Sequence, residues 1–165
     1  MAENSGRTYS SIGPTGQQIG QNVAVIRGQK GVTTEQLAQR LTDVGVPIKA
    51  SAITKVEKGQ RRLTVDELVA LAVVLDVNPS ALMLPVEVDR DRPVEITGHG
   101  EVPAARAWQW VDGHKPLPGR ASREQAEQFD QAVRPWWLRA NTLTVADLNK
   151  PRFRPLDYDA PENET

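Results

Sequence analysis

Apolar residues recur at helical spacing through residues 17–84, a region without a single aromatic side chain. Positions three or four residues apart share one face of a helix, so this spacing predicts amphipathic helices packed around an aliphatic core. The first helix is expected over about residues 17–30, where Ile19, Val23 and Ile26 form one stripe. The pattern therefore predicts an all-α fold for this part of the chain.

Capping residues locate the starts of the other helices. A side-chain oxygen before a helix accepts hydrogen bonds from its first free N–H groups, and a Gln or Glu three residues later completes a capping box. The predicted starts are Thr33 with Gln36, Thr64 with Glu67, and Asn78 followed by Pro79. A further helix is expected from Lys49 or Ala50 to Lys58, because Gly59 can take the left-handed conformation that ends helices. Five helices are thus predicted in residues 17–84.

The flanking segments differ in composition. Residues 1–16 are rich in Ser, Gly and Thr and are expected to form a flexible arm. Residues 85–93 are charged and bounded by prolines, which predicts a linker or an edge strand. Residues 94–139 hold all four tryptophans and are expected to form a mostly helical, Trp-rich extension, followed by an irregular tail over residues 140–165.

The pattern within the extension predicts one strand and two helices. Residues 94–97 alternate between apolar and polar, as in a short strand, and helices are expected over 103–112 and 122–134. The second helix carries a capping box and an apolar stripe, formed by Ser122 with Gln125 and by Ala126, Phe129 and Val133. Three roles are open for the tryptophans: a second core packed on the first domain, a dimer interface, or a ligand pocket.

Charge is distributed unevenly along the chain. The net charge is −1, but residues 20–62 contain eight Lys and Arg against three Asp and Glu, a local excess of five positive charges. Such a block suits a polyanionic partner, and an ordinary solvated surface is the alternative. The absence of cysteine excludes disulfides, thiolate catalysis and cysteine-ligated zinc, and it fits a cytoplasmic protein.

Several function classes find no support in the residues. The chain has no apolar run of the roughly 18–20 residues that a membrane span needs. It contains no glycine-rich phosphate loop and no nucleophile motif, and neither His99 nor His114 has metal-ligand spacing. We therefore expect no membrane contact, no catalytic residue, no cofactor and no metal.

Two of the predicted helices are joined by a turn over residues 42–48, within the positively charged block. This is the arrangement of a helix-turn-helix, whose second helix enters the DNA major groove. The chain resembles the Cro/CI (Xre) family of transcriptional regulators, in the style of actinobacterial members, over about residues 19–84. The resemblance is carried by Leu37-Ala38, by Ile53 and Val56-Glu57-Lys58-Gly59, and by Leu71-Ala72 with Leu75-Asp76-Val77.

The resemblance implies a five-helix, lambda-repressor-like domain that binds double-stranded DNA sequence-specifically. It further implies a transcriptional regulator of repressor type, with the recognition helix at about residues 49–58. A homodimer is expected, because two-fold pairing doubles the number of base pairs read. The aromatic side chains that follow the five-helix region are the expected interface, and a monomer is the alternative. The alternative is an antitoxin-like or scaffold protein that keeps the fold and binds a protein partner through residues 94–139.

The residues expected to contact DNA fall into two groups. Ile53 and Val56 should point inward, so the other positions of the recognition helix face the groove. These groove residues are Lys49, Ala50, Ser51, Thr54, Lys55 and Lys58. The residues expected at the phosphate backbone are Thr33, Thr34, Gln60, Arg61 and Arg62. Lys55 can reach either a guanine edge or a phosphate.

Glu57 is expected to be structural. The resemblance implies this, because the acid at this position is structural in the family pattern, and here it is expected to pair with a basic neighbour. The candidate partners are Arg27 in the first helix and Arg40 in the second.

Overall fold

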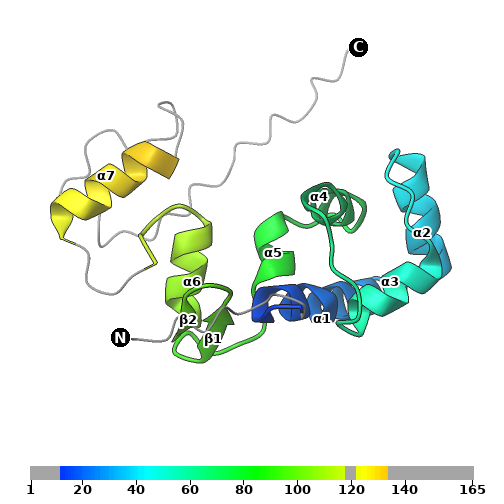
Figure 1. The fold of residues 1–165 in the computed structure, drawn as a ribbon, viewed down its shortest axis with the longest axis horizontal. Coiled ribbons are helices and arrows are strands. Elements are labelled where there is room, and N and C mark those ends of the chain that lie inside the picture. The colour runs from blue at the N-terminus through cyan, green and yellow to red at the C-terminus, as the bar shows by residue number, and fades with distance from the viewer. Residues whose placement is uncertain (1–11, 118–121, 134–165) are drawn as a thin grey trace, which may run out of the picture.

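The computed structural model describes residues 12–117 and 122–133 (Figure 1). In these residues it contains seven helices and one two-stranded antiparallel sheet. The first five helices are α1 (Pro14–Gln29), α2 (Thr34–Asp43), α3 (Ala50–Glu57), α4 (Val65–Val74) and α5 (Pro79–Met83). The elements that follow are β1 (Pro93–Ile96), β2 (Gly100–Pro103), α6 (Ala104–Val111) and α7 (Arg123–Val133). The predicted, mostly helical fold is confirmed, and within the described residues no helix reaches the length and hydropathy that a membrane crossing requires.

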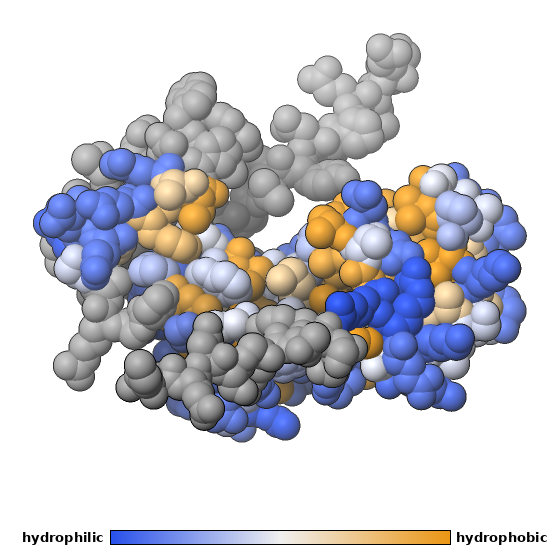
Figure 2. Space-filling model, viewed as in Figure 1, coloured by the Kyte–Doolittle hydropathy of each residue, from blue (hydrophilic) through white to orange (hydrophobic). Residues whose placement is uncertain are grey.

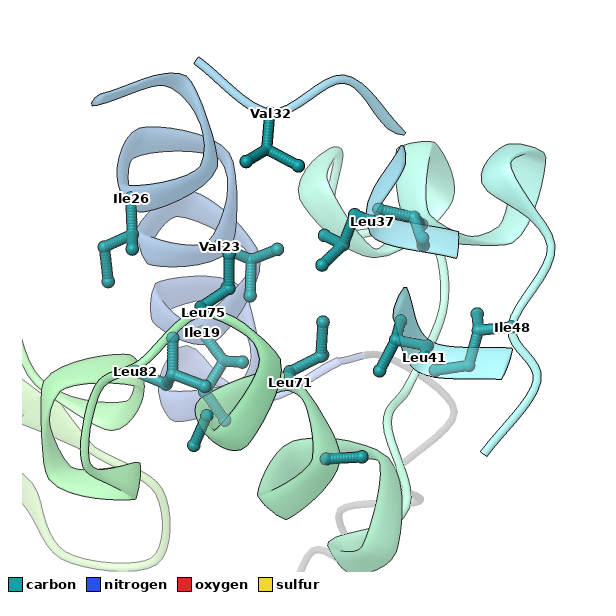
Figure 3. Packing of buried hydrophobic residues seen from close by; sticks show 13 residues of the cluster. Ile19, Val23, Ile26, Val32, Leu37, Leu41, Ile48, Leu71, Leu75 and Leu82 are labelled. Carbon is teal, nitrogen blue, oxygen red and sulfur yellow. The ribbon is translucent and has the colours of Figure 1, made fainter. Parts of the chain in front are cut away.

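One aliphatic core lies between α1, α2, α3, α4 and α5 (Figure 3). Its most deeply buried large side chains, each at most 2% exposed, are Val23, Leu37, Leu41, Ile53, Leu71, Leu75 and Leu82. Full burial of such a side chain stabilises the fold by about 1.5–3 kcal/mol. The predicted aliphatic core is therefore confirmed, with contributions from all five helices.

The caps lie where the sequence predicts them. Thr33 and Gln36 form a capping box before α2, and Thr64 and Glu67 form one before α4. In each box the threonine Oγ1 accepts from the third helical N–H at 3.2 Å, and the threonine N–H donates back to that residue's side chain at 2.9 Å. Gly59 has a φ of 64°, the left-handed conformation expected after α3.

The first helix begins earlier than expected. It starts at Pro14, so residues 14–16 form its first turn and are not part of a flexible arm. Gly13 is the extended N-cap, and the fixed φ of Pro14 suits the first helical position. The sequence pattern missed this turn because it contains no apolar residue that extends the stripe of α1. The remainder of the predicted arm, residues 1–11, lies outside the described residues.

A second, smaller core is built by the extension. The predicted strand is confirmed as β1, and it pairs with β2, which the sequence did not predict. Gly98 and Gly100, with φ of 83° and 102°, allow the chain to turn between the strands. The core consists of Leu84, Val94, Ile96, Val102, Ala104, Ala107 and Leu117.

Trp108 and Trp110 pack against this second core. These two side chains therefore belong to a second core packed on the first domain, which is one of the three roles that the sequence left open. Trp136 and Trp137 lie outside the described residues. In α7 the predicted Ser122–Gln125 capping box is present, but no residue of this helix is buried, so the predicted apolar stripe packs on no described core.

Hydrogen bonds join the two cores. The Asn22 Nδ2 atom donates to the carbonyl oxygens of Ala81, Leu82 and Leu84 at 3.1, 2.9 and 2.8 Å, so a side chain of α1 caps the end of α5. At the start of α1, the backbone N–H of Thr15 donates to Thr97 Oγ1, and the N–H of Thr97 donates to Thr15 Oγ1. The hairpin is thereby fixed to the first helix.

The segment over 85–93, predicted as a linker or an edge strand, is anchored near both ends. The Trp108 indole N–H donates to the Pro85 carbonyl at 3.0 Å, and the Ala104 N–H donates to the Arg92 carbonyl at 2.8 Å. Both bonds come from residues of α6, so this segment is held against the extension rather than being a free linker.

Candidate nucleic-acid interface

The α2–α3 unit is built around a turn at residues 44–49. Gly45, with a φ of 82°, ends α2, and the Val46 N–H donates to the Leu41 carbonyl at 2.9 Å. Ile48 is only 4% exposed, so it anchors the turn in the core before α3 begins. The two helices therefore have a fixed relation to each other.

α3 lies directly against α1. A Cβ atom added at Gly20 would lie 2.3 Å from the carbonyl oxygen of Val56, far inside van der Waals contact. Only glycine permits this approach of one helix to the backbone of the other. The sequence analysis missed this role, although a glycine next to Ile19 in a helical stripe was a visible signal.

An ion pair fixes the end of α3. Arg27 Nε lies 2.6 Å from Glu57 Oε1, and Arg27 Nη2 lies 3.2 Å from Glu57 Oε2. The remaining Nη1 donates to the Val32 carbonyl at 2.7 Å. The hydrogen bond to Glu57 raises the pKa of Arg27 above its usual value. Glu57 is thus structural, as predicted, and Arg27 rather than Arg40 is its partner.

The opposite side of α3 carries the predicted groove residues. Ile53 and Val56 are 2% and 3% exposed, as the inward face requires. The exposed residues are Lys49, Ser51, Lys55 and Lys58, and the half-buried ones are Ala50 and Thr54. Thr54 Oγ1 donates to the Ala50 carbonyl at 3.1 Å, so its hydroxyl proton is already used within the helix. The outer surface of α3 is therefore formed mainly by three lysines and a serine.

The start of α2 holds Thr33 and Thr34 beside a carboxylate. Thr33 Oγ1 accepts from the backbone N–H of Gln36, and Thr34 Oγ1 donates to Glu35 Oε2 at 3.2 Å. The backbone N–H of Glu35 and the hydroxyls of Thr33 and Thr34 lower the pKa of the Glu35 carboxyl. A phosphate approaching this helix end would therefore meet a carboxylate beside the two hydroxyls.

The loop between α3 and α4 presents Gln60, Arg61 and Arg62. Gln60 and Arg62 are exposed, whereas Arg61 is half-buried and forms a bidentate pair with Glu67, at 3.1 Å and 2.5 Å. These hydrogen bonds lower the pKa of Glu67, the same residue that completes the capping box of α4. Arg61 therefore stabilises the start of α4, a role that the sequence analysis missed.

One family model and two solved structures are similar to part of this chain. The helix-turn-helix family model matches residues 23–82. The restriction-modification controller protein C.AhdI from Aeromonas hydrophila is 30% identical over 40% of this chain and 92% of its own, with a TM-score of 0.36. The DNA-binding domain of BldD is 25% identical over 44% of this chain and 99% of its own, with a TM-score of 0.37. No curated protein sequence matches the chain.

Proposed function

We propose that this protein is a repressor-type transcriptional regulator that binds specific double-stranded DNA. Residues 23–82 belong to the helix-turn-helix family of the Cro/CI type, whose members are DNA-binding transcriptional regulators. The observation that supports this most is the composition of α3. Its inner face is buried, and its outer face exposes Lys49, Ser51, Lys55 and Lys58. A rigid helix with cations on its solvent side suits the major groove.

Within this proposal, α3 reads bases and the flanking segments bind phosphates. Ser51 can donate to or accept from several bases, and Lys55 can reach a guanine O6 or N7 atom. Ala50 can only contact an apolar group such as a thymine methyl. Thr54 serves chiefly through its methyl group, because its hydroxyl donates to the helix backbone.

The phosphate contacts are proposed on both sides of α3. Gln60 and Arg62 lie on the loop that leaves α3, with Lys49 and Lys58 at the two ends of the helix. Arg61, which is held by Glu67, acts mainly by positioning this loop. Thr33 and Thr34 serve as neutral hydrogen-bonding groups at the start of α2.

Selection from a random pool of duplexes, with the full chain as bait, tests the proposal. A DNA-binding regulator should enrich one motif, and its affinity for that motif should fall steeply with salt. A reporter gene placed behind the motif should be expressed less when the protein is present. A pool without enrichment would favour the scaffold or antitoxin reading, and an increase in reporter expression would overturn the repressor assignment.

A further inference from the structure

A cavity of about 350 Å³ lies between the start of α1, the loop that leaves α3, and the turn between β1 and β2. Its walls come from within residues 12–19, from residues 61–63 and from residue 97, so the five-helix domain, the extension and the candidate interface meet here. Figure 2 shows hydrophilic surface over the loop between α3 and α4, with hydrophobic surface beside it. Small-molecule sites are concavities of about 300–1,000 Å³ that combine apolar walls with a few polar groups.

One part of the cavity wall is apolar. Ile12, Ile19 and Leu63 line it, and the rest of the protein leaves Ile12 and Leu63 only half-buried. Gly16 gives Ile12 room to lie over the first turn of α1, because a Cβ atom at Gly16 would lie 2.7 Å from Ile12 Cγ2. These aliphatic side chains favour an apolar ligand group, because the group would remove their remaining apolar surface from water.

The other part of the wall suits an anion. Of the described residues that line the cavity, Arg61 and Arg62 carry charge, and Arg61 is already paired with Glu67. Arg62 is exposed, and its planar guanidinium has five N–H donors, so it can bind a carboxylate in addition to its contacts within the protein. Thr97 Oγ1 accepts from the Thr15 N–H at 3.2 Å, which leaves the hydroxyl proton of Thr97 to donate to a ligand.

We propose that this cavity binds a small organic acid. Its carboxylate contacts Arg62 and the Thr97 hydroxyl, and its apolar body lies against the aliphatic wall formed by Ile12, Ile19 and Leu63. Arg62 is also the side chain proposed to bind a DNA phosphate from this loop. A carboxylate on Arg62 takes the place of that phosphate, so the bound acid lowers the affinity for DNA. This regulatory step rests on the proposed function, whereas the binding site itself does not.

Nuclear magnetic resonance of the full chain, labelled with nitrogen-15, tests the site without DNA. Hexanoate carries both a charge and an apolar body, acetate carries the charge with almost no apolar body, and hexanamide carries the apolar body without the charge. Hexanoate should shift the backbone amide signals of Gly13, Gly16 and Thr97 in a saturable way, with an affinity about tenfold above that of either other probe. Equal affinities for the three probes, or no shifts at these amides, would overturn the proposal.

Two arginine variants locate the carboxylate. Arg62→Ala should weaken hexanoate binding about tenfold, because it removes the charged partner of the carboxylate. Arg92→Ala is the matched control, because Arg92 is also exposed but lines a separate cavity of about 340 Å³ between α1 and residues 85–95. This control should bind hexanoate as the wild type does. Equal hexanoate binding by the wild type and Arg62→Ala would overturn the proposed site.

DNA binding provides the second arm. With the motif selected above, the wild type should bind its duplex about fivefold more weakly in saturating hexanoate than in acetate at the same concentration, which is the contribution of one phosphate contact near physiological salt. The equal ionic strength removes ordinary salt screening from the comparison. Equal DNA affinity in the two solutions would overturn the regulatory step. Failure to bind any duplex would overturn the proposed function, while the resonance titration would still decide the site.

Discussion

Arg27 is the side chain that holds the end of α3 to α1. Its guanidinium contacts both carboxylate oxygens of Glu57 and the carbonyl oxygen of Val32, so it joins α1, α3 and the segment before α2. A bidentate pair fixes geometry as well as contributing energy, because the planar guanidinium matches the carboxylate. The orientation of α3 therefore depends on a residue outside that helix.

Replacing Glu57 by Ala should lower the free energy of unfolding by about 1.5–3 kcal/mol, the usual contribution of hydrogen bonds to a charged group. Urea unfolding followed by circular dichroism measures the loss. Glu127→Ala is the control, because it breaks the Arg123–Glu127 pair, whose side chains are 86% and 59% exposed. Such an exposed pair contributes less than about 0.5 kcal/mol. Equal losses in the two variants would contradict the structural role of Glu57.

Acid sensitivity should depend on Glu67. Arg61 holds the pKa of this carboxyl below its usual 4.5. A carboxyl with a lowered pKa stabilises the fold above its unfolded pKa, and this contribution is lost as the pH falls through the folded pKa. The wild type should therefore lose more stability between about pH 5 and pH 3 than Glu67→Gln does. Melting temperatures of both proteins across this range test the prediction, and parallel curves would refute it.

Arg61 and Arg62 should behave differently when each is replaced by Ala. Arg62→Ala should reduce the slope of log affinity against log salt by about 0.9, the value for one phosphate contact. Arg61→Ala should instead lower the melting temperature, because it removes the partner of Glu67. Titrations of one duplex at several salt concentrations, together with thermal melts, separate the two effects. If Arg62→Ala keeps the wild-type salt dependence of affinity, the Arg62 side chain does not contact the DNA phosphate backbone.

At the scale of elements, α1 and α3 approach closely at Gly20. The nearest atom to a Cβ at this position belongs to the backbone of Val56, which cannot rotate away as a side-chain tip could. The contact therefore sets the distance between the two helices.

Gly20→Ala should destabilise the protein, by about 1–3 kcal/mol, as overpacking usually does. The opposite sign is expected for Gly28→Ala in the same helix, because nothing lies within 4 Å of a Cβ there. In that exposed helical position alanine is favoured over glycine by up to about 1 kcal/mol. Urea unfolding of the pair provides the comparison. A stabilising Gly20→Ala would mean that α1 and α3 lie further apart than the structure places them.

Features that depend on residues close together in the sequence, such as helix caps, were predicted better than contacts between helices. The capping boxes at Thr33 and Thr64 involve residues three apart, so their spacing alone identifies them. The partner of Glu57 could be narrowed to two arginines by charge, but the choice depends on how α1 crosses α3. The contact of Gly20 with Val56 depends on the same crossing, so the sequence could signal a glycine beside the stripe of α1 but could not identify Val56 as its neighbour.

Two further features, β2 and the ion pair between Arg61 and Glu67, were not predicted from the sequence. β2 is only four residues long, and its pairing with β1 follows from a turn whose glycines have several uses in other contexts. Arg61 was predicted to contact DNA because a cation in this loop can pair with a phosphate as well as with a carboxylate. Its partner Glu67 also completes the capping box, so one side chain has two roles and its spacing in the sequence signals only one of them.

At the scale of the whole molecule, Asn22 links the two cores. The Asn22 side chain extends from α1 and donates to three carbonyl oxygens at the end of α5. One of these carbonyls belongs to Leu84, which is a member of the second core. The five-helix domain and the extension should therefore unfold together, although the sequence suggested separate units.

Asn22→Asp should cost about 3 kcal/mol of stability, because a carboxylate cannot donate to the three carbonyl oxygens, which lie in buried or partly buried positions. Gln21→Glu is the matched control, since it adds the same charge at an exposed neighbouring position, where about 0.5 kcal/mol or less is expected. Circular dichroism reports all the helices, and tryptophan fluorescence reports the extension, which holds all four tryptophans. Both midpoints should fall together in Asn22→Asp. An unchanged fluorescence midpoint would show that the extension is independent of this link.

The backbone contact at Gly20 also bears on how this protein can diversify. The position of α3 is set by a carbonyl oxygen, a partly buried ion pair and inward-facing aliphatic side chains, none of which is among the exposed lysines and the serine. The outer residues of α3 can therefore be exchanged without moving the helix that carries them. If these residues read bases as proposed, a duplicated copy of this gene could acquire a new target sequence through a few surface substitutions, while its scaffold stays the same.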